Sequence, residues 1–131
     1  MKGESKVFLF LKPYKNLNEV LTDHKLASLG DVYVNFVYAL ALSNKRRVPS
    51  GAKVKGSILA EAIKRADLRE FLPSRMERHL LADAAEALIV YAWLNNFVTL
   101  GESVSILEKF DDPVEGFSHL LREIKSKIRF S

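Results

Sequence analysis

The fold is decided by the stretch KLASLGDVYVNFVYALALS at residues 25–43. Its apolar residues cover nearly every face of a helix, and only Gly30, Asp31, Asn35 and a few small residues interrupt them. A helix that is apolar all round must be buried on most sides, by the core of its own chain or by a partner subunit. This stretch therefore predicts a central helix in an all-α protein.

The segments that follow it read as further helices joined by short loops. Residues 57–66 predict an amphipathic helix with Ser57 as its N-cap. Residues 74–97 predict a second long helix, with Ser74 and Glu77 at the capping-box spacing at its start. Residues 102–110 and 113–128 predict two more helices. The last of these has Asp112 as its N-cap and proline at its first position, where a proline is well tolerated.

The segments before it are shorter and less regular. Residues 6–12 (KVFLFLK) predict an edge strand or an extended arm, which ends at Pro13. Asn16 predicts the N-cap of a short helix, with Glu19 at the capping-box spacing. There is no internal repeat, low-complexity tract or linker, so we expect one helical domain over residues 1–131.

Composition limits the classes of protein to which the chain can belong. Of its 131 residues 48% are hydrophobic, which is enough for one core, and there is no cysteine. Disulfides, thiolate zinc sites and cysteine nucleophiles are thereby excluded. No apolar run reaches the roughly 20 residues of a membrane span, so we expect a cytoplasmic protein without a membrane partner. The net charge of +4 permits a nucleic-acid partner without requiring one.

Three acidic residues stand inside apolar helical stretches. Asp31 lies in the first long helix, and Asp83 and Glu86 lie three residues apart on one face of the second. Burying an unpaired carboxylate is costly, so these groups need a cation, a partner or water. Carboxylates on facing helices can share a divalent ion, and oxygen ligands favour Mg²⁺, Mn²⁺ or Ca²⁺. The alternative is that each is solvated or paired with a basic neighbour, such as Arg78 or His79.

At this point the residues resemble a known family, the ribonuclease III catalytic domain. The segment LGDVYVNFVYALAL (residues 29–42) is similar to the signature helix of that family. The segment ADAAEAL (residues 82–88), followed by IVYAWL, is similar to its second acidic helix, and VKGSILAEAI (residues 54–63) resembles the segment between them. The three occur in the family's order, and the short chain looks like the Mini-III variant without a double-stranded RNA-binding domain.

The resemblance implies a fold, an activity and a site. It implies an all-α endonuclease domain that dimerises through the helix at residues 25–43 and cleaves double-stranded or structured RNA with Mg²⁺, Mn²⁺ being possible. It places Asp31, Asp83 and Glu86 at three of the family's four catalytic, metal-binding acids. Two ions would then activate water and stabilise the leaving oxygen.

The sequence departs from the family pattern at two acidic positions. Ala27 stands where the family usually has a glutamate one turn before Asp31, and His24 stands at an acidic position further upstream. Mini-III ribonucleases also carry a non-acidic residue at the first position. An acid from elsewhere, such as Glu19, Asp23 or Glu61, could compensate, and His24 could serve as a substitute ligand or proton shuttle.

The densest basic segment is the predicted loop at residues 44–56. It carries five cations, and contacts between such side chains and phosphates give salt-dependent affinity without reading sequence. A-form RNA is recognised largely by shape and backbone, which suits such a loop. With the resemblance, we expect RNA contact from Lys45, Arg46, Arg47, Lys53 and Lys55.

Three functional hypotheses follow from these features. The first is a homodimeric, magnesium-dependent endoribonuclease. The second is a ribonuclease III-like RNA-binding dimer that has lost nuclease activity. The third is a plain helical interaction protein with chance similarity, for which Asp83 and Glu86 would not face Asp31.

Overall fold

The structure is a computed structural model, and it describes residues 7–130. Within that range it contains six α-helices, a 3-10 helix and no β-strand. The α-helices are α1 (Leu17–Leu21), α2 (His24–Arg46), α3 (Gly56–Arg65), α4 (Arg78–Leu94), α5 (Leu100–Glu108) and α6 (Pro113–Lys127), and the 3-10 helix is η2 (Arg69–Phe71). The expected all-α fold is therefore confirmed.

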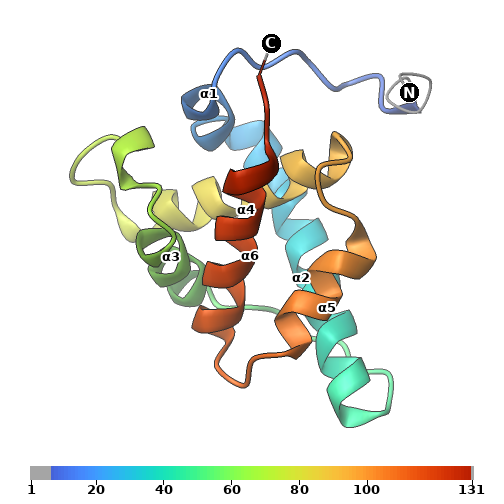
Figure 1. The fold of residues 1–131 in the computed structure, drawn as a ribbon. Helices are drawn as coiled ribbons and strands as arrows, with labels where there is room; N and C mark the ends of the chain where they lie inside the picture. The colour runs from blue at the N-terminus through green and yellow to red at the C-terminus, as the bar shows by residue number, and fades with distance from the viewer. Residues whose placement is uncertain (1–6, 131) are drawn as a thin grey trace.

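Helix α4 is the centre around which the other helices pack. Most of its residues are buried, from Leu81 to Leu94. Its most extensive contact is with α2, followed by α3, and it also touches α1 and α6. Figure 1 shows α6 in front of α4, with α3 on one side and α2 and α5 on the other. A helix enclosed in this way needs apolar side chains on nearly all faces, which explains the IVYAWL run.

The helix starts test the capping predictions. Asn16 caps α1 by accepting a hydrogen bond from the Glu19 amide at 3.0 Å, and Asp112 caps α6 by accepting one from Val114. Both N-caps are confirmed, but Glu19 accepts from the Lys15 amide and so does not complete a capping box with Asn16. Helix α5 begins two residues before its predicted start, with a capping box between Thr99 and Glu102.

Two other predicted starts are wrong. Helix α3 begins at Gly56 with Lys55 as its N-cap, so Ser57 lies inside the helix. Helix α4 begins at Arg78, four residues later than predicted, and Ser74 is not its cap. The physical reason is the backbone of Arg75, whose φ of 59° is left-handed and incompatible with a helix.

Helix α2 is longer than the apolar run from which it was predicted, and it reaches the length of a membrane span. Its 23 residues would be long and apolar enough to cross a bilayer. The core helix of a globular protein passes the same test, and α2 buries Tyr33, Val34 and Val37 against other helices. Its burial is incomplete, because several large apolar side chains of α2 remain exposed.

The segment before α1 forms no strand within the described residues. Residues 8–15 run as irregular chain, with a turn in which the Leu11 amide donates to the Phe8 carbonyl. The Phe8 ring packs 5.8 Å from Trp93, which stacks on Tyr33 at 4.7 Å. Of the edge strand and the extended arm predicted for this segment, the structure therefore has an arm. Its Phe8 packs on the aromatic side chains of α2 and α4.

Candidate active site

Gly30 brings the two long helices into backbone contact. A Cβ on Gly30 would overlap the backbone carbonyl of Glu86 and lie 3.1 Å from the Glu86 Cβ. Glycine inside a helix costs about 1 kcal/mol relative to alanine. Its presence here is explained by the close approach of α2 to α4 at this residue. The next residue, Asp31, is thereby held beside Glu86.

The three predicted acids come together at this contact. Glu86 is only 8% exposed, whereas Asp83 is half-buried and Asp31 is exposed. Burial, a hydrogen bond with Asp31 and the charges of Asp31 and Asp83 together raise the pKa of Glu86 to about 8. Two carboxyl groups can share a hydrogen bond only when one is protonated, so the cluster holds a proton near neutral pH. The prediction of the third hypothesis, that these acids do not face Asp31, is wrong for Glu86.

Within residues 7–130 the acid cluster has no compensating lysine or arginine side chain. None of the ion pairs formed by Lys or Arg within residues 7–130 includes Asp31, Asp83 or Glu86. Carboxylate oxygens suit a hard divalent ion, and such an ion would replace the shared proton as the positive charge. As they stand, no three acidic or histidine side chains of the described residues converge around a single point. The chemistry of these donors suits a divalent ion, but their side chains as placed do not form a site for one.

The basic residue that contacts the cluster is His24. Its Nδ1 lies 3.8 Å from Asp83 Oδ2, at the first residue of α2. His79, one of the two partners considered from the sequence, lies instead 3.4 Å from Glu77. Arg78, the other, forms no ion pair within the described part of the chain.

None of the three acids considered as substitutes takes the place of the missing glutamate. Ala27 is buried, and the three acids considered as substitutes are engaged elsewhere. Glu19 accepts from the Lys15 amide, and Asp23 caps α2 while accepting 2.6 Å from the Tyr14 hydroxyl. Glu61 pairs with Arg65 at 3.1 Å. The cluster is thus a three-carboxylate site.

Asn35 connects the cluster to the basic loop, and sequence analysis missed this role. Its Nδ2 donates to the Asp31 carbonyl at 2.9 Å and to Asp31 Oδ1 at 3.3 Å. Its Oδ1 accepts from the Val54 amide at 2.8 Å. The available signal was a polar residue one turn after Asp31 in an otherwise apolar helix.

The five predicted basic residues fall into two groups. Lys53 and Lys55 flank Val54, so Asn35 holds this part of the loop near Asp31. Arg46 and its neighbours lie at the far end of α2, and a rise of 1.5 Å per residue puts Lys45 about 21 Å from Asp31 along the axis.

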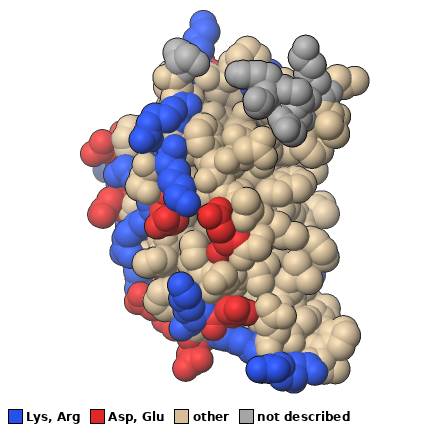
Figure 2. Space-filling model, turned by 45° about the vertical axis from the view of Figure 1, so that its right-hand side comes forward, with Lys and Arg blue, Asp and Glu red and all other residues tan. Residues whose placement is uncertain are grey.

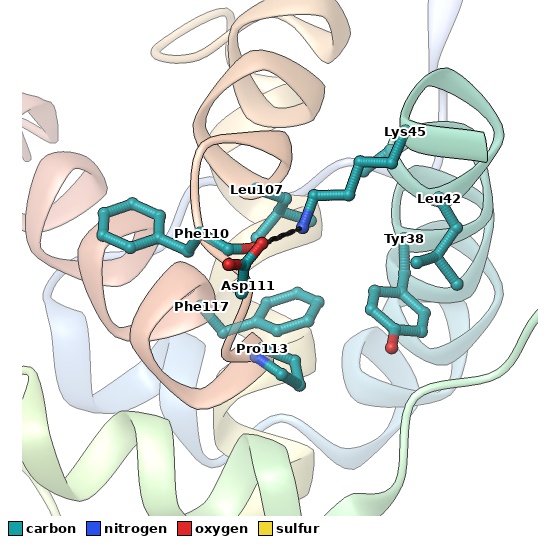
Figure 3. Close-up of a pocket in the computed structure, with 9 residues that line it drawn as sticks. Tyr38, Leu42, Lys45, Leu107, Phe110, Asp111, Pro113 and Phe117 are labelled. Atoms are coloured by element: carbon teal, nitrogen blue, oxygen red, sulfur yellow. Dashed lines mark hydrogen bonds and ion pairs between the residues drawn. The ribbon is translucent and has the colours of Figure 1, made fainter. Parts of the chain in front are cut away.

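Lys45 is also bound to its own chain. Its Nζ lies 3.8 Å from Asp111 and donates to the Phe110 carbonyl. Figure 3 shows this side chain reaching across a small pocket between α2 and the α5–α6 connection, over Phe117 and Pro113. An amine held in this way is less free to bind phosphate than Lys53 or Lys55.

A second basic surface was missed by sequence analysis. Lys64, Arg69, Arg75 and Arg78 line one hollow in front of the N-terminus of α4. Of these, only Lys64 forms an ion pair within the described residues, with Glu61. The four residues are spread over 15 residues of sequence. They form no run of consecutive basic residues, so the sequence pattern did not indicate that they share a surface.

An exposed apolar stripe runs along α2 beside the acids. Leu29, Val32 and Phe36 are 39%, 68% and 55% exposed, and their spacing of three and four residues places them on one face. Solvent-exposed apolar side chains in a contiguous row mark an interaction surface. Figure 2 shows charged side chains gathered along one side of the view and a broad area without them on the other.

The chain matches the family model described as Ribonuclease III over residues 24–128. This match covers most of the 131 residues, including Asp31, Asp83 and Glu86, and the chain belongs to the ribonuclease III family. Comparison with curated proteins gives no match. Members of this family generally use divalent metal ions and act on RNA, so the family indicates a role in RNA processing.

Proposed function

We propose that this protein is a magnesium-dependent endoribonuclease that cleaves double-stranded or structured RNA at the cluster of Asp31, Asp83 and Glu86. The observation that carries the proposal is the buried carboxyl of Glu86, whose pKa is raised to about 8 and which has two acidic neighbours but no basic one. Such a group is unfavourable in a purely structural site and is suited to binding a cation.

The acidic residues of the cluster would bind the metal ion, and the nearby lysines would bind the RNA. The carboxylates of Asp31, Asp83 and Glu86 would hold the ion, Mg²⁺ with Mn²⁺ as a substitute. A bound divalent ion supplies Lewis-acid activation of the phosphodiester and of the attacking water. Lys53 and Lys55 would bind backbone phosphates next to this centre, since Asn35 ties their segment to Asp31.

The test is cleavage of duplex RNA by the purified protein with Mg²⁺. Glu86→Gln keeps the size of the side chain and removes a ligand, so we expect a loss of at least about 100-fold in rate. Glu70→Gln, at an exposed glutamate of η2, is the matched control and should cleave normally. Intact duplex with the unaltered protein, or equal rates for the two variants, would refute the proposal.

A second candidate function is a ribonuclease III-like RNA-binding protein without nuclease activity. The observation in its favour is Ala27, because the site has three carboxylates and no substitute for the fourth. It predicts salt-sensitive RNA binding, no cleavage and no bound ion at millimolar Mg²⁺. The same cleavage assay, run beside a binding titration, separates the two functions.

RNA binding should depend more on the near cations than on the far ones. We expect the pair Lys53→Ala and Lys55→Ala to weaken duplex binding by about tenfold, because both contact phosphates close to the cluster. The pair Arg46→Ala and Arg47→Ala should weaken it less. Equal losses for the two double variants would argue for a binding surface that extends along the whole of α2.

The stripe of Leu29, Val32 and Phe36 supports a homodimer formed through residues 25–43. A two-fold axis along α2 would cover the stripe with its own copy and place two acid clusters in one assembly. Val32→Asp should convert the dimer to a monomer in sedimentation. Val48→Asp, at a valine that is 52% exposed beyond the end of α2, is the matched control. A monomeric unaltered protein would contradict this part of the proposal.

A further inference from the structure

The basic hollow in front of α4 combines positive charge with apolar side chains. Its basic residues are Lys64, Arg69, Arg75 and Arg78, and none of the residues that line it is acidic. We propose that this hollow binds the end of an RNA strand, with the terminal phosphate on the arginines and the unpaired end base against the apolar side chains. This inference rests on the proposed RNA-cleaving function and names the part of the RNA that this surface recognises.

The positive charge of the hollow is largely unpaired within the described residues. Arg69, Arg75 and Arg78 are exposed, and none of them forms an ion pair within residues 7–130. The fourth cation, Lys64, lies 3.9 Å from Glu61. Three arginines without acidic partners around one hollow suit an anion that carries more than one negative charge.

A terminal phosphate fits this charge better than an internal one does. A phosphodiester inside a strand carries one negative charge, whereas a phosphomonoester carries about −1.5 to −2 near pH 7 and has three acceptor oxygens. Arginine binds phosphate oxygens through two parallel N–H groups, which gives these contacts both strength and direction. Several arginines around a concave site can therefore share the oxygens of one terminal phosphate.

The rest of the lining accounts for the base next to that phosphate. It consists of Leu72, Pro73, Ser74, Met76 and Leu81. Apolar side chains can pack on the face of a base only where the base is unstacked, as at an unpaired strand end. The hollow has a volume of about 450 Å³, within the roughly 300–1,000 Å³ of ordinary small-ligand sites. Its size and lining thus suit a nucleotide better than a bare ion.

The hollow is close enough to the acid cluster for both to bind one RNA molecule. Arg78 lies five residues before Asp83 and eight before Glu86 on α4, and a rise of 1.5 Å per residue separates them by about 8 and 12 Å along the axis. An RNA end held at Arg78 therefore brings a nearby part of the same molecule to the proposed cleavage centre.

The competing explanation is that the arginines contact phosphates inside the duplex. Such contacts strengthen the binding of every duplex by the same factor, whatever its ends carry. Removing them would weaken phosphorylated and unphosphorylated RNA equally. End recognition predicts instead a loss confined to RNA with a phosphorylated end.

The experiment compares RNA hairpins that differ only at their ends. Each has a short unpaired tail at the 5′ or the 3′ end, with or without a terminal phosphate, and binding to the purified full chain is titrated in a chelator, so that nuclease activity is not needed. We expect a phosphorylated tail at one of the two ends to bind about tenfold more tightly than the same tail with a hydroxyl. The two tail positions show which strand end the hollow takes.

The test variant is Arg69→Gln combined with Arg75→Asn. Arg75 has a left-handed φ of 59°, which asparagine tolerates, so the pair removes two charges without straining the backbone. It should abolish the preference for phosphate while the hydroxyl hairpin binds within about twofold of normal. Retained binding of the hydroxyl hairpin also shows that the variant is folded.

The matched control is Arg46→Gln combined with Arg47→Asn. Arg47 has the same left-handed φ of 59° and lies at the C-terminal end of α2, so this pair removes the same charge from the same two kinds of backbone. The control should weaken the phosphate and hydroxyl hairpins alike, and the preference for phosphate should remain.

Three outcomes overturn the inference. They are equal binding of phosphate and hydroxyl hairpins by the unaltered protein, a preference that persists in the test variant, and an equal loss of both hairpins in that variant. The last outcome would assign the hollow to internal phosphates. If the preference depends on the arginines but the protein does not cleave RNA with Mg²⁺, the end site stands and the proposed nuclease function fails.

Discussion

The two halves of α2 differ in whether their charged and polar side chains have partners of opposite charge. In the C-terminal half, Lys45 pairs with Asp111, and Asn44 donates to Glu108 at 2.8 Å. In the N-terminal half, Asp31 lies against the buried acid Glu86, whose pKa is raised to about 8. The charge pairs at one end add to the stability of the fold, while the cluster at the other end has no lysine or arginine partner within the described residues and is the place where we propose that a cation binds. One helix thus serves both as scaffold and as part of a site.

The largest expected effect is on the free energy of unfolding, and it comes from the contact of Gly30 with the Glu86 backbone in the N-terminal half of α2. Gly30→Ala drives a methyl group into the backbone of Glu86, so we expect the free energy of unfolding to fall by about 3 kcal/mol. Denaturant unfolding followed by circular dichroism measures the change. Gly101→Ala is the control, because no atom lies within 4 Å of its added Cβ. That variant should gain up to about 1 kcal/mol from helix propensity. Similar values for the two would mean that α2 and α4 are further apart than described.

The next effect is the pH dependence of stability in the metal-free protein. The pKa of Glu86 is raised from 4.5 to about 8 in the folded state, so the folded protein binds this proton more tightly than the unfolded chain does. Its stabilising contribution is fully present below about pH 4.5 and is lost as the pH rises through about 8. Thermal unfolding in a chelator should show Tm falling over this interval.

Glu86→Gln should flatten that part of the profile, because the amide does not titrate. Glu70→Gln should leave it unchanged. A fall in Tm of equal size in Glu86→Gln and in the unaltered protein would assign the pH dependence to other groups.

A smaller effect distinguishes the polar contacts of the two halves. Asn35→Ala removes the hydrogen bonds to Asp31 and Val54, and should cost about 1.5 kcal/mol after its gain in helix propensity. Asn44→Ala removes one exposed hydrogen bond and should cost about 0.5 kcal/mol or less. Only Asn35→Ala should also slow RNA cleavage. Equal behaviour of the two variants would show that Asn35 does not position Asp31.

The smallest expected effect is the contribution of the Lys45–Asp111 ion pair, in the C-terminal half of α2, to the stability of the fold. The Lys45–Asp111 pair is largely solvated, since the Asp111 side chain is fully exposed. A double-mutant cycle with Lys45→Ala and Asp111→Ala should give a coupling below about 1 kcal/mol that vanishes in high salt. A larger, salt-independent coupling would mean that this end of α2 is held by charge and not by apolar packing.

Sequence reasoning succeeded where a local pattern carries the information. Apolar periodicity predicted α2 and α4, and the caps at Asn16 and Asp112 were predicted from side chains that act within one turn. The grouping of Asp31 with Asp83 and Glu86 came from polar residues in apolar helices and from the family resemblance. Family membership and the all-α fold were both confirmed by later comparison.

The errors concern features that depend on the backbone or on distant residues. Ser74 has every local mark of a helix start, and only the left-handed Arg75 shows why the helix begins later. The basic hollow around Arg69 and Arg78 joins residues from separate elements, and no run of consecutive basic residues marks it in the sequence. The expectation that α2 is buried on most sides, by its own core or by a partner subunit, is not met by the core of this chain at Val32 and Phe36, because apolar composition alone does not say what covers a face.

The backbone contact at Gly30 has a consequence for how this protein can change over time. The spacing of α2 and α4 is set by main-chain atoms, so the scaffold does not depend on which side chains project around it. Substitutions at positions such as 24 or 83 can therefore exchange one donor for another while the helices stay in place. A lineage built on this contact can lose, regain or redirect its chemistry by single steps, without passing through an unfolded intermediate form.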